Sequence, residues 1–360
     1  ISGILNSLMV LLGYGLPKCP EAILRSIDID SRPGTFVHAV HPAGCSKATT
    51  AACHAILMAF NVGMSKMYGD VEEFHSRILA GSGGFLPVID IEGTDRQGGR
   101  FGAPLLDVAL AAGYGAMPGR DGIDSAGPLH SPFAAISNVE TYEARYPLLY
   151  LWRRQETDSG GLGRRRGGRG VSLAWTPHKA GSSVGVVLHG HGCAVASTPG
   201  TGGGYPGATN TFALARGTGS RSTMAAGQIP QDESQLGTDI EHPSGLHMTR
   251  LEEGDVVIAC NNGGGGFGDP LSREPDRVLV DVRLGAVSPE WARHGYGVVV
   301  DGDEVDLAAT TQLREELRSR RLARRPDGEL PANDSTPGPR QCAGCGSNSQ
   351  NVIRNRRRLS

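Results

Sequence analysis

The stretch Asp158 to Val171, with the sequence DSGGLGRRRGGRGV, places six glycines and four arginines within fourteen residues. Glycine at this density is unsuited to a helix or an ordinary strand, because each glycine adds backbone freedom that folding must remove. We therefore expect a shaped turn between two strand-like segments, residues 146–153 and 171–177. This turn would present Arg164, Arg165, Arg166 and Arg169.

Two interpretations of these four arginines stay open from the sequence. Arginines on one corner of the chain can hold a carboxylate or a phosphate through paired N–H donors. A charged turn that faces solvent would have the same composition.

A second glycine loop, residues 113–127 (GYGAMPGRDGIDSAG), carries Asp121 and Asp124. These two aspartates are candidates for a general acid, a general base or a hard-metal ligand. The alternative is that they close turns through bonds from side chain to backbone, as aspartates beside glycines do.

Residues 137–152 combine a turn at 138–140 with the strand-like run YPLLYLW. We expect a short rigid strand to hold Glu140, Glu143 and Arg145 close to the arginine-rich stretch. These charges are candidates for the wall of a pocket, and an ion-pair network without chemistry is the alternative.

The segment NNGGGGFGDP, from Asn261 to Pro270, has the glycine content of a phosphate-binding loop. A Walker loop needs Gly-Lys-Ser/Thr at the start of a helix, and a dinucleotide fingerprint needs G-x-G-x-x-G between a strand and a helix. Neither lysine nor Ser/Thr follows Gly268. The segment is therefore predicted to be a backbone-lined cavity wall, with Asn262 and Asp269 as its polar groups.

Two residue pairs have the spacing of half a metal site. His189 and His191 lie at i and i+2, so they would face the same side of a strand. Cys342 and Cys345 form a CxxC motif. A zinc site needs further ligands, and the sequence identifies none near either pair.

Composition limits the class of protein. The chain has 360 residues with 53 glycines, 22 prolines and 5% aromatic residues, which favours many short strands and turns over a helical bundle. A net charge of -2 gives no support to nucleic-acid binding, and seven scattered cysteines suit a reducing cytosol. The apolar run at residues 4–12 lacks a basic leader and is too short for a membrane span.

The order of apolar patterns predicts an α+β fold: a strand-rich mixed body with helices near the start and the end. Expected helices lie within 48–79, 274–284, 289–294 and 303–324, expected strands within 17–39, 85–91, 184–193 and 251–259, and residues 212–240 are predicted to be a surface excursion. Three parts are predicted: an N-terminal α/β part (1–135) truncated upstream, a strand-rich body with glycine loops and a closing helix (136–325), and a flexible tail with the CxxC (326–360).

Four motifs in one order resemble the hydantoinase B / 5-oxoprolinase / acetone carboxylase alpha-subunit family, in the C-terminal part of such a subunit. They are Gly119 to Asp124, Asn138 to Pro147, Asp158 to Val171 and Asn262 to Pro270. The resemblance runs from about residue 17 to about residue 324. One glycine motif would be weak evidence, but four in this order make a chance match improbable.

The resemblance implies a subunit of a cytoplasmic, ATP-dependent hetero-oligomer that opens a cyclic amide or carboxylates a ketone. A hydantoinase A-type, kinase-like partner subunit would bind ATP and phosphorylate the substrate. The resemblance also implies a divalent metal whose ligands belong to an N-terminal region that this sequence lacks, so the fragment alone is expected to be inactive. The run VETYEARYPLLYLWRR is closer to the acetone and acetophenone carboxylase branch.

One physical hypothesis joins these observations: the arginine-rich stretch and the glycine loops line a cavity that accepts a phosphorylated lactam or enol. Replacing Arg165 or Arg166 with alanine would then lower turnover and leave the fold intact. The alternative is a non-catalytic scaffold whose glycine loops dock partner subunits.

Overall fold

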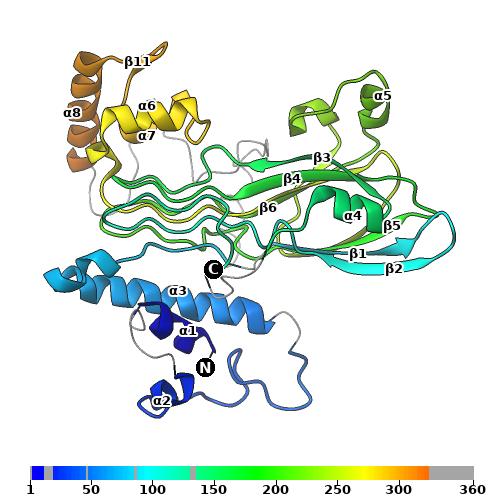
Figure 1. The fold of residues 1–360 in the computed structure, drawn as a ribbon, viewed down its shortest axis with the longest axis horizontal. Helices are drawn as coiled ribbons and strands as arrows, with labels where there is room; N and C mark the ends of the chain where they lie inside the picture. Colours follow the sequence, from blue (N-terminus) through cyan, green and yellow to red (C-terminus); the bar gives the residue numbers. More distant parts are fainter. Residues whose placement is uncertain (1, 12–18, 46–47, 85–86, 130–134, 324–360) are drawn as a thin grey trace, which may run out of the picture.

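The structure is a computed structural model that describes residues 2–11, 19–45, 48–84, 87–129 and 135–323. Helices at both ends of the described chain flank a body of antiparallel strands and glycine-rich segments (Figure 1). The predicted α+β class is therefore confirmed.

The N-terminal helices form one layer beneath the glycine-rich segments (Figure 1). Helix α1 (Ser2–Leu11) packs on α3 (Ala48–Gly69), and the 3-10 helix η1 (Glu72–Arg77) follows, as expected for residues 48–79. The strands predicted within 17–39 are wrong. That segment holds the short helix α2 (Pro20–Leu24), and residues 19–45 bury no side chain, so they offer no face on which a sheet could form.

Two antiparallel sheets pack face to face. The four-stranded sheet has the order β2 (Arg100–Leu105), β1 (Val88–Thr94), β5 (Val184–His189) and β8 (Leu246–Leu251). The five-stranded sheet has the order β3 (Leu148–Gln155), β4 (Val171–Pro177), β9 (Val256–Cys260), β6 (Thr211–Ala215) and β7 (Ile240–Glu241). One apolar core lies between them, and it includes Ile89 and Leu188 of the first sheet with Trp175 and Phe212 of the second.

Several strand predictions need correction. The predicted surface excursion at 212–240 begins with β6, whose residues from Phe212 are buried inside the sheet. Such a short strand, buried on both faces, leaves no alternating pattern to detect. The single strand expected at 251–259 is two strands of different sheets, separated by a turn at Gly254 with φ +104. The predicted boundary after residue 135 falls between strands of one sheet, since β1 and β2 precede it and β5 and β8 follow it.

The C-terminal helices lie where the sequence predicted them. They are α6 (Pro275–Arg283), α7 (Pro289–Tyr296) and α8 (Leu307–Ala323). Local signals set the bounds of α7: the hydroxyl of Ser288 accepts from the amide of Trp291, and Gly297 ends the helix with φ 63. The smaller elements are α4 (Val139–Arg145), α5 (Ser220–Ala225), η2 (Glu233–Leu236), η3 (Pro270–Ser272), β10 (Val300–Asp301) and β11 (Glu304–Val305).

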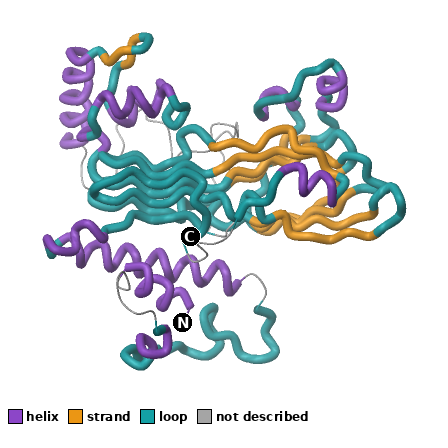
Figure 2. Tube along the Cα trace, viewed as in Figure 1, coloured by secondary structure: helices purple, strands orange, loops and turns teal. Residues whose placement is uncertain are grey.

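The glycine-rich segments run side by side and form what we call the glycine bundle (Figure 2). Its members are residues 80–84, 113–117, 159–170, 198–208 and 261–268. In the segment 261–268, three consecutive amides bond to three different neighbouring segments. The amide of Gly264 donates to the Gly168 carbonyl at 2.9 Å, that of Gly265 to the Gly81 carbonyl at 2.7 Å, and that of Gly266 to the Tyr205 carbonyl at 2.9 Å. Successive amides that point in three different directions are typical of an extended helix with three residues per turn and no internal hydrogen bonds.

Close packing explains why the contact positions between bundle segments are glycines. A Cβ atom on Gly264 would stand 2.0 Å from the carbonyl oxygen of Tyr114, and one on Gly167 would stand 1.9 Å from that of Gly264. Both distances are well inside van der Waals contact, and the obstacle is backbone that cannot rotate away. The glycine bundle therefore depends on the absence of side chains.

Candidate functional site

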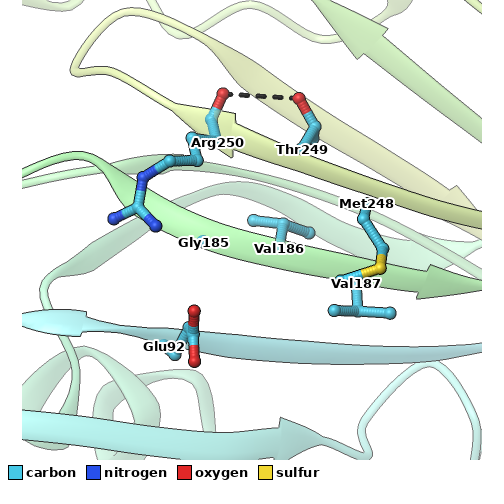
Figure 3. Close-up of a pocket in the computed structure, with 7 residues that line it drawn as sticks. All are labelled: Glu92, Gly185, Val186, Val187, Met248, Thr249 and Arg250. Carbon is cyan, nitrogen blue, oxygen red and sulfur yellow. Dashed lines mark hydrogen bonds between the residues drawn. The ribbon is translucent and has the colours of Figure 1, made fainter.

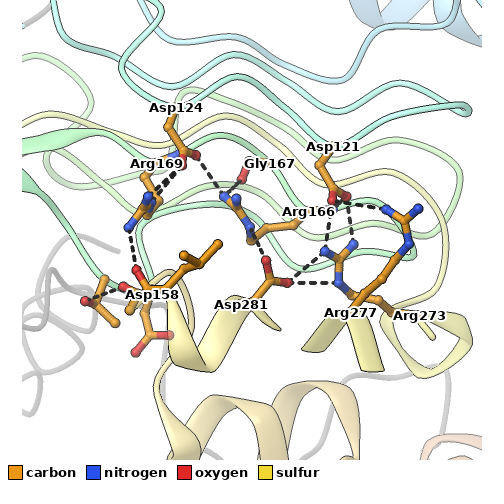
Figure 4. A network of polar contacts seen from close by, with 12 residues as sticks. Asp121, Asp124, Asp158, Arg166, Gly167, Arg169, Arg273, Arg277 and Asp281 are labelled. Carbon is orange, nitrogen blue, oxygen red and sulfur yellow. Dashed lines mark hydrogen bonds and ion pairs between the residues drawn. The ribbon is translucent and has the colours of Figure 1, made fainter. Parts of the chain in front are cut away.

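Buried ion pairs join the arginine-rich stretch to the second glycine loop and to α6 (Figure 4). Arg166 donates to Asp124 at 3.0 Å and to Asp281 at 3.3 Å. Arg273 donates to both carboxylate oxygens of Asp121, at 2.7 and 2.9 Å, and its Nη2 lies 2.7 Å from Asp281. These side chains form a continuous chain of alternating charge, which we call the ion-pair network.

Backbone amides of the arginine-rich stretch complete this network. The amide of Arg166 donates to Asp121 at 2.7 Å, and the amide of Arg169 donates to Asp124 at 2.7 Å. The guanidinium of Arg169 also pairs with Asp124, at 2.8 Å. The aspartates thus accept hydrogen bonds from backbone amides, as the turn-closing alternative expected, and they also bind the arginines.

Sequence reasoning missed two members of the network, Arg273 and Asp281. Arg273 lies just beyond the glycine motif, and no local pattern marks it. Asp281 does carry a signal, because it interrupts the apolar run from Val278 to Val282. A charge inside such a run is seldom buried without a partner.

The network favours the ionised form of Asp121 and Asp124. Burial alone would raise the pKa of Asp121, but the hydrogen bonds and charge of Arg273 outweigh it and lower that pKa. Burial would likewise raise the pKa of Asp124. The charge of Arg166 and the hydrogen bond from the amide of Arg169 outweigh burial, so that pKa is lowered. A general base near neutral pH needs a pKa close to 7, so this arrangement favours structural pairing over proton transfer.

The other two arginines of the stretch take no part in the ion-pair network. Arg164 is exposed and Arg165 is partly buried, with its Nε donating to the carbonyl of Pro118 at 3.3 Å. Within the described ranges, neither guanidinium has a carboxylate within ion-pair distance. The arginine-rich stretch is thus divided into two locked and two available side chains.

The glycine loops converge, but the space between them is filled by backbone. Residues 261–270 were predicted to be a backbone-lined cavity wall, but at Gly263 to Gly266 the main chains of neighbouring segments approach closer than any side chain would allow. Asn262 is fully buried, with its Nδ2 donating to the Ser197 hydroxyl at 3.0 Å. Asp269 lies at the other end of the segment, where it caps η3 through the amide of Leu271 at 2.9 Å.

The structure does not bring the charged residues of segment 137–152 to the ion-pair network. Glu140, Glu143 and Arg145 belong to helix α4, where a turn followed by a strand was expected. In Figure 1, α4 lies beside the strands, well away from α6. Glu143 accepts a hydrogen bond from the amide of Tyr150 at 2.8 Å, so it fixes the start of β3.

The candidate metal ligands are also dispersed. Strand β5 ends at His189, whose Nε2 lies 2.8 Å from Asp90, and His191 follows beyond the strand. In the part of the chain that the structure describes, no three His, Cys, Asp or Glu side chains gather as a metal site would require. Cys342 and Cys345 lie outside the described residues. Among the described residues, His189 and His191 therefore belong to no cluster with the number of ligands that a metal site needs.

Two cavities lie away from the arginine-rich stretch. The first, of about 250 Å³, is a shallow hollow on the four-stranded sheet (Figure 3), lined by Glu92, Gly185, Val186, Val187, Met248, Thr249 and Arg250. The second, of about 370 Å³, lies among α1, α3 and residues 27–30, and is lined by Ile4, Leu8, Ile27, Asp28, Ile29, Asp30 and Phe60. Separately, none of the described helices combines the length and apolar character needed to cross a bilayer.

The fold and the site define a class of α+β protein with two packed sheets and a glycine bundle. Buried Asp–Arg pairs join the bundle to the C-terminal helices. The chain belongs to the hydantoinase B/oxoprolinase family, whose sequence profile matches residues 1–270. That range contains all four motifs that carried the resemblance.

Known relatives agree with this assignment. The chain is 32% identical to the caprolactamase subunit beta of Pseudomonas jessenii over 322 residues, which cover 86% of this chain and 50% of the relative. It is 32% identical to the acetone carboxylase alpha subunit of Xanthobacter autotrophicus over 254 residues, which cover 64% of this chain and 31% of the relative. The chain thus spans half or less of the length of these relatives.

Solved structures show the same fold. The ATP-dependent caprolactamase of Pseudomonas jessenii superposes with a TM-score of 0.72 and 26% identity, over 87% of this chain and 50% of that one. Nucleotide-free acetone carboxylase superposes with a TM-score of 0.69 and 27% identity, over 79% of this chain and 39% of that one.

Proposed function

We propose that this chain is part of a subunit of an ATP-dependent enzyme that opens a cyclic amide. The observation that carries the proposal is the extent of the match to the caprolactamase subunit, which covers 86% of the chain against 64% for the acetone carboxylase subunit. The run VETYEARYPLLYLWRR favoured the carboxylase branch, but it is a short local signal. A similarity that spans most of the chain outweighs it.

The described residues would supply the framework of this enzyme. ATP would be used on a kinase-like, hydantoinase A-type partner subunit, and this subunit would receive the phosphorylated substrate. Two features support this division: the glycine-rich segments carry no nucleotide-binding motif, and the ion-pair network commits Arg166 and Arg169 to carboxylates of the same chain. A divalent metal would be held by residues other than those described.

A second candidate is a non-catalytic scaffold subunit of the same kind of complex. The observation in its favour is the ion-pair network, because charges already neutralised by buried partners have little left to offer a substrate. The backbone-filled interior of the glycine bundle points the same way.

Turnover by the reconstituted complex tests both candidates. The complete subunit that contains this chain would be purified with its ATP-binding partner, and ATP consumption measured with caprolactam, 5-oxoproline, hydantoin, or acetone with bicarbonate. We expect ATP consumption that depends on a cyclic amide and yields the ring-opened product. ATP use with acetone and bicarbonate alone would assign the chain to ketone carboxylation, and assembly without turnover would favour the scaffold. Metal analysis of the same sample tests the implied divalent ion.

A further inference from the structure

Arg164 and Arg165, the two arginines of the stretch outside the ion-pair network, lie at one end of the glycine bundle. The amide of Arg164 bonds to the carbonyl of Gly268 at 3.1 Å, and that of Arg165 bonds to the carbonyl of Phe267 at 2.9 Å. These bonds fix the backbone at the point where the bundle segments turn. Both arginines are therefore presented from a rigid base.

A third arginine belongs to the neighbouring turn. Met117 and Arg120 exchange backbone hydrogen bonds of 3.0 and 3.3 Å, and the side chain of Arg165 reaches Pro118 inside that turn. Arg120 is exposed, and its Nε donates to the sulfur of Met117 at 3.2 Å. Arg120 and Arg165 thus share one edge of the bundle end.

Helix α8 adds two further arginines to the same end. Arg321 pairs with Asp269 at 2.8 Å and lies over the ring of Tyr205, with 6.0 Å between Cζ and the ring centroid. Arg318 donates to the carbonyl of Leu271 at 3.5 Å. Because Asp269 directly follows Gly268, these contacts place the arginines of α8 beside Arg164. We call Arg120, Arg164, Arg165, Arg318 and Arg321 the basic end.

The basic end keeps an excess of positive charge. Two neighbouring carboxylates are committed, Asp121 to Arg273 and Asp269 to Arg321. Arg120, Arg164, Arg165 and Arg318 have no carboxylate within ion-pair distance among the described residues. Such clustered like charges repel one another unless an anionic surface neutralises them. This distribution contrasts with the ion-pair network a few residues away, where the charges are matched.

We propose that the basic end is the docking surface for an acidic face of the ATP-binding partner subunit, an inference that rests on the proposed function. The arginines stand on turns and on an exposed helix face, and neither of the two cavities described above reaches them. A cationic surface on turns and a helix fits a protein face better than an enclosed small molecule. Arginine also suits this role, because its planar fork binds carboxylates through two hydrogen bonds and arginine is enriched at interfaces.

Charge reversal tests the docking surface. Arg164→Glu with Arg165→Glu would be introduced into the complete subunit, and binding to the ATP-binding partner measured by sedimentation and by titration at several salt concentrations. The matched control is Arg96→Glu with Arg100→Glu, two exposed arginines beside the β1–β2 turn at the opposite end of the molecule. Circular dichroism would establish that both variants keep the fold.

We expect the basic-end variant to bind the partner at least about 100-fold more weakly, the control to bind normally, and the wild-type affinity to fall as salt rises. Equal binding by wild type and both variants would overturn this inference and leave the proposed function standing. Binding of inorganic phosphate to the wild type but not to the basic-end variant, with partner affinity unchanged, would replace it with a small-anion site. Failure of the wild-type subunit to bind any ATP-binding partner would overturn both proposals.

Discussion

Arg273 binds both carboxylate oxygens of Asp121, at 2.7 and 2.9 Å, across 152 positions of sequence. The same guanidinium reaches Asp281 of α6, and Asp281 in turn contacts Arg166 in the glycine bundle. The C-terminal helices are thus attached to the bundle by charges as well as by apolar contacts such as those of Leu162. Loss of one of these charges should therefore destabilise the contacts among several elements at once.

Removal of Arg273 should destabilise the protein strongly. Its side chain is 1% exposed, and Arg273→Met would leave the buried Asp281 and the half-buried Asp121 with fewer partners. We expect the free energy of unfolding to fall by about 3–5 kcal/mol, measured by urea denaturation.

The matched control for this substitution is Arg277→Met. Arg277 also approaches Asp121, at 3.9 Å, but its side chain is 54% exposed. Its replacement should change stability by less than about 1 kcal/mol. Similar losses in the two variants would show that burial of the ion-pair network contributes nothing.

Alanine at the centre of the glycine bundle should be poorly tolerated. In Gly264→Ala the new Cβ would meet the carbonyl of Tyr114 at 2.0 Å, so two hydrogen-bonded segments would have to separate. We expect a loss of about 3 kcal/mol or more in urea denaturation, at the upper end of overpacking effects.

Gly119→Ala is the control for the bundle substitution. A Cβ on Gly119 meets no atom within 4 Å, and its φ lies outside the left-handed region. This substitution should stabilise the protein by about 0.4–1 kcal/mol, because it restricts the unfolded chain. If both alanines were neutral, the close packing of the bundle would be refuted.

Sequence patterns predicted the parts of the molecule that depend on local chemistry. Helix α6 begins at a proline, α7 has a serine cap, and β4 (Val171–Pro177) is a short, mainly apolar strand, so each could be located without knowledge of its neighbours. Convergence of the glycine loops could also be inferred. Their arrangement could not, because glycine has no side chain whose pattern would reveal three surrounding neighbours.

The site was predictable only in part for a similar reason. Asp121, Asp124, Arg166 and Arg169 lie in recognisable motifs, whereas Arg273 and Asp281 acquire their role through contacts made by folding. Helix α4 was predicted to be a turn and a strand because the aromatic run after it favours a strand. Tertiary contacts decide such cases, among them the bond from the amide of Tyr150 to Glu143.

Stability should fall in acid through the ion-pair network. The pKa of Asp124 is lowered in the folded state, so its contribution is present above the unfolded value of about 3.9 and is lost as pH falls through the folded value. Asp124→Asn should therefore be less stable than wild type at pH 7, with a difference that shrinks as pH falls below about 4. Urea denaturation at a series of pH values measures this, and a difference that stayed constant with pH would contradict it.

Asp107 should show the opposite dependence on pH. Its side chain is 1% exposed, and burial raises its pKa despite hydrogen bonds from the Tyr150 hydroxyl at 2.5 Å and the Val108 amide at 2.9 Å. A raised pKa means that this group stabilises the fold most below the unfolded value of about 3.9 and loses that contribution as pH rises through the folded value. Ionised Asp107 is thus a cost at neutral pH.

Asp107→Asn should remove that cost. The amide can keep both contacts, since the Tyr150 hydroxyl can accept as well as donate, while the loss of the 4.0 Å approach to the partly exposed Arg153 matters little. We expect the variant to be more stable than wild type at pH 7, and the gain to disappear near pH 4. Asp107→Leu is the control: it leaves the Tyr150 hydroxyl unpaired and should lose about 1–3 kcal/mol at both pH values. If Asp107→Asn instead lost stability at pH 7, the ionised carboxylate of Asp107 would be stabilised in the folded protein, and the raised pKa would be contradicted.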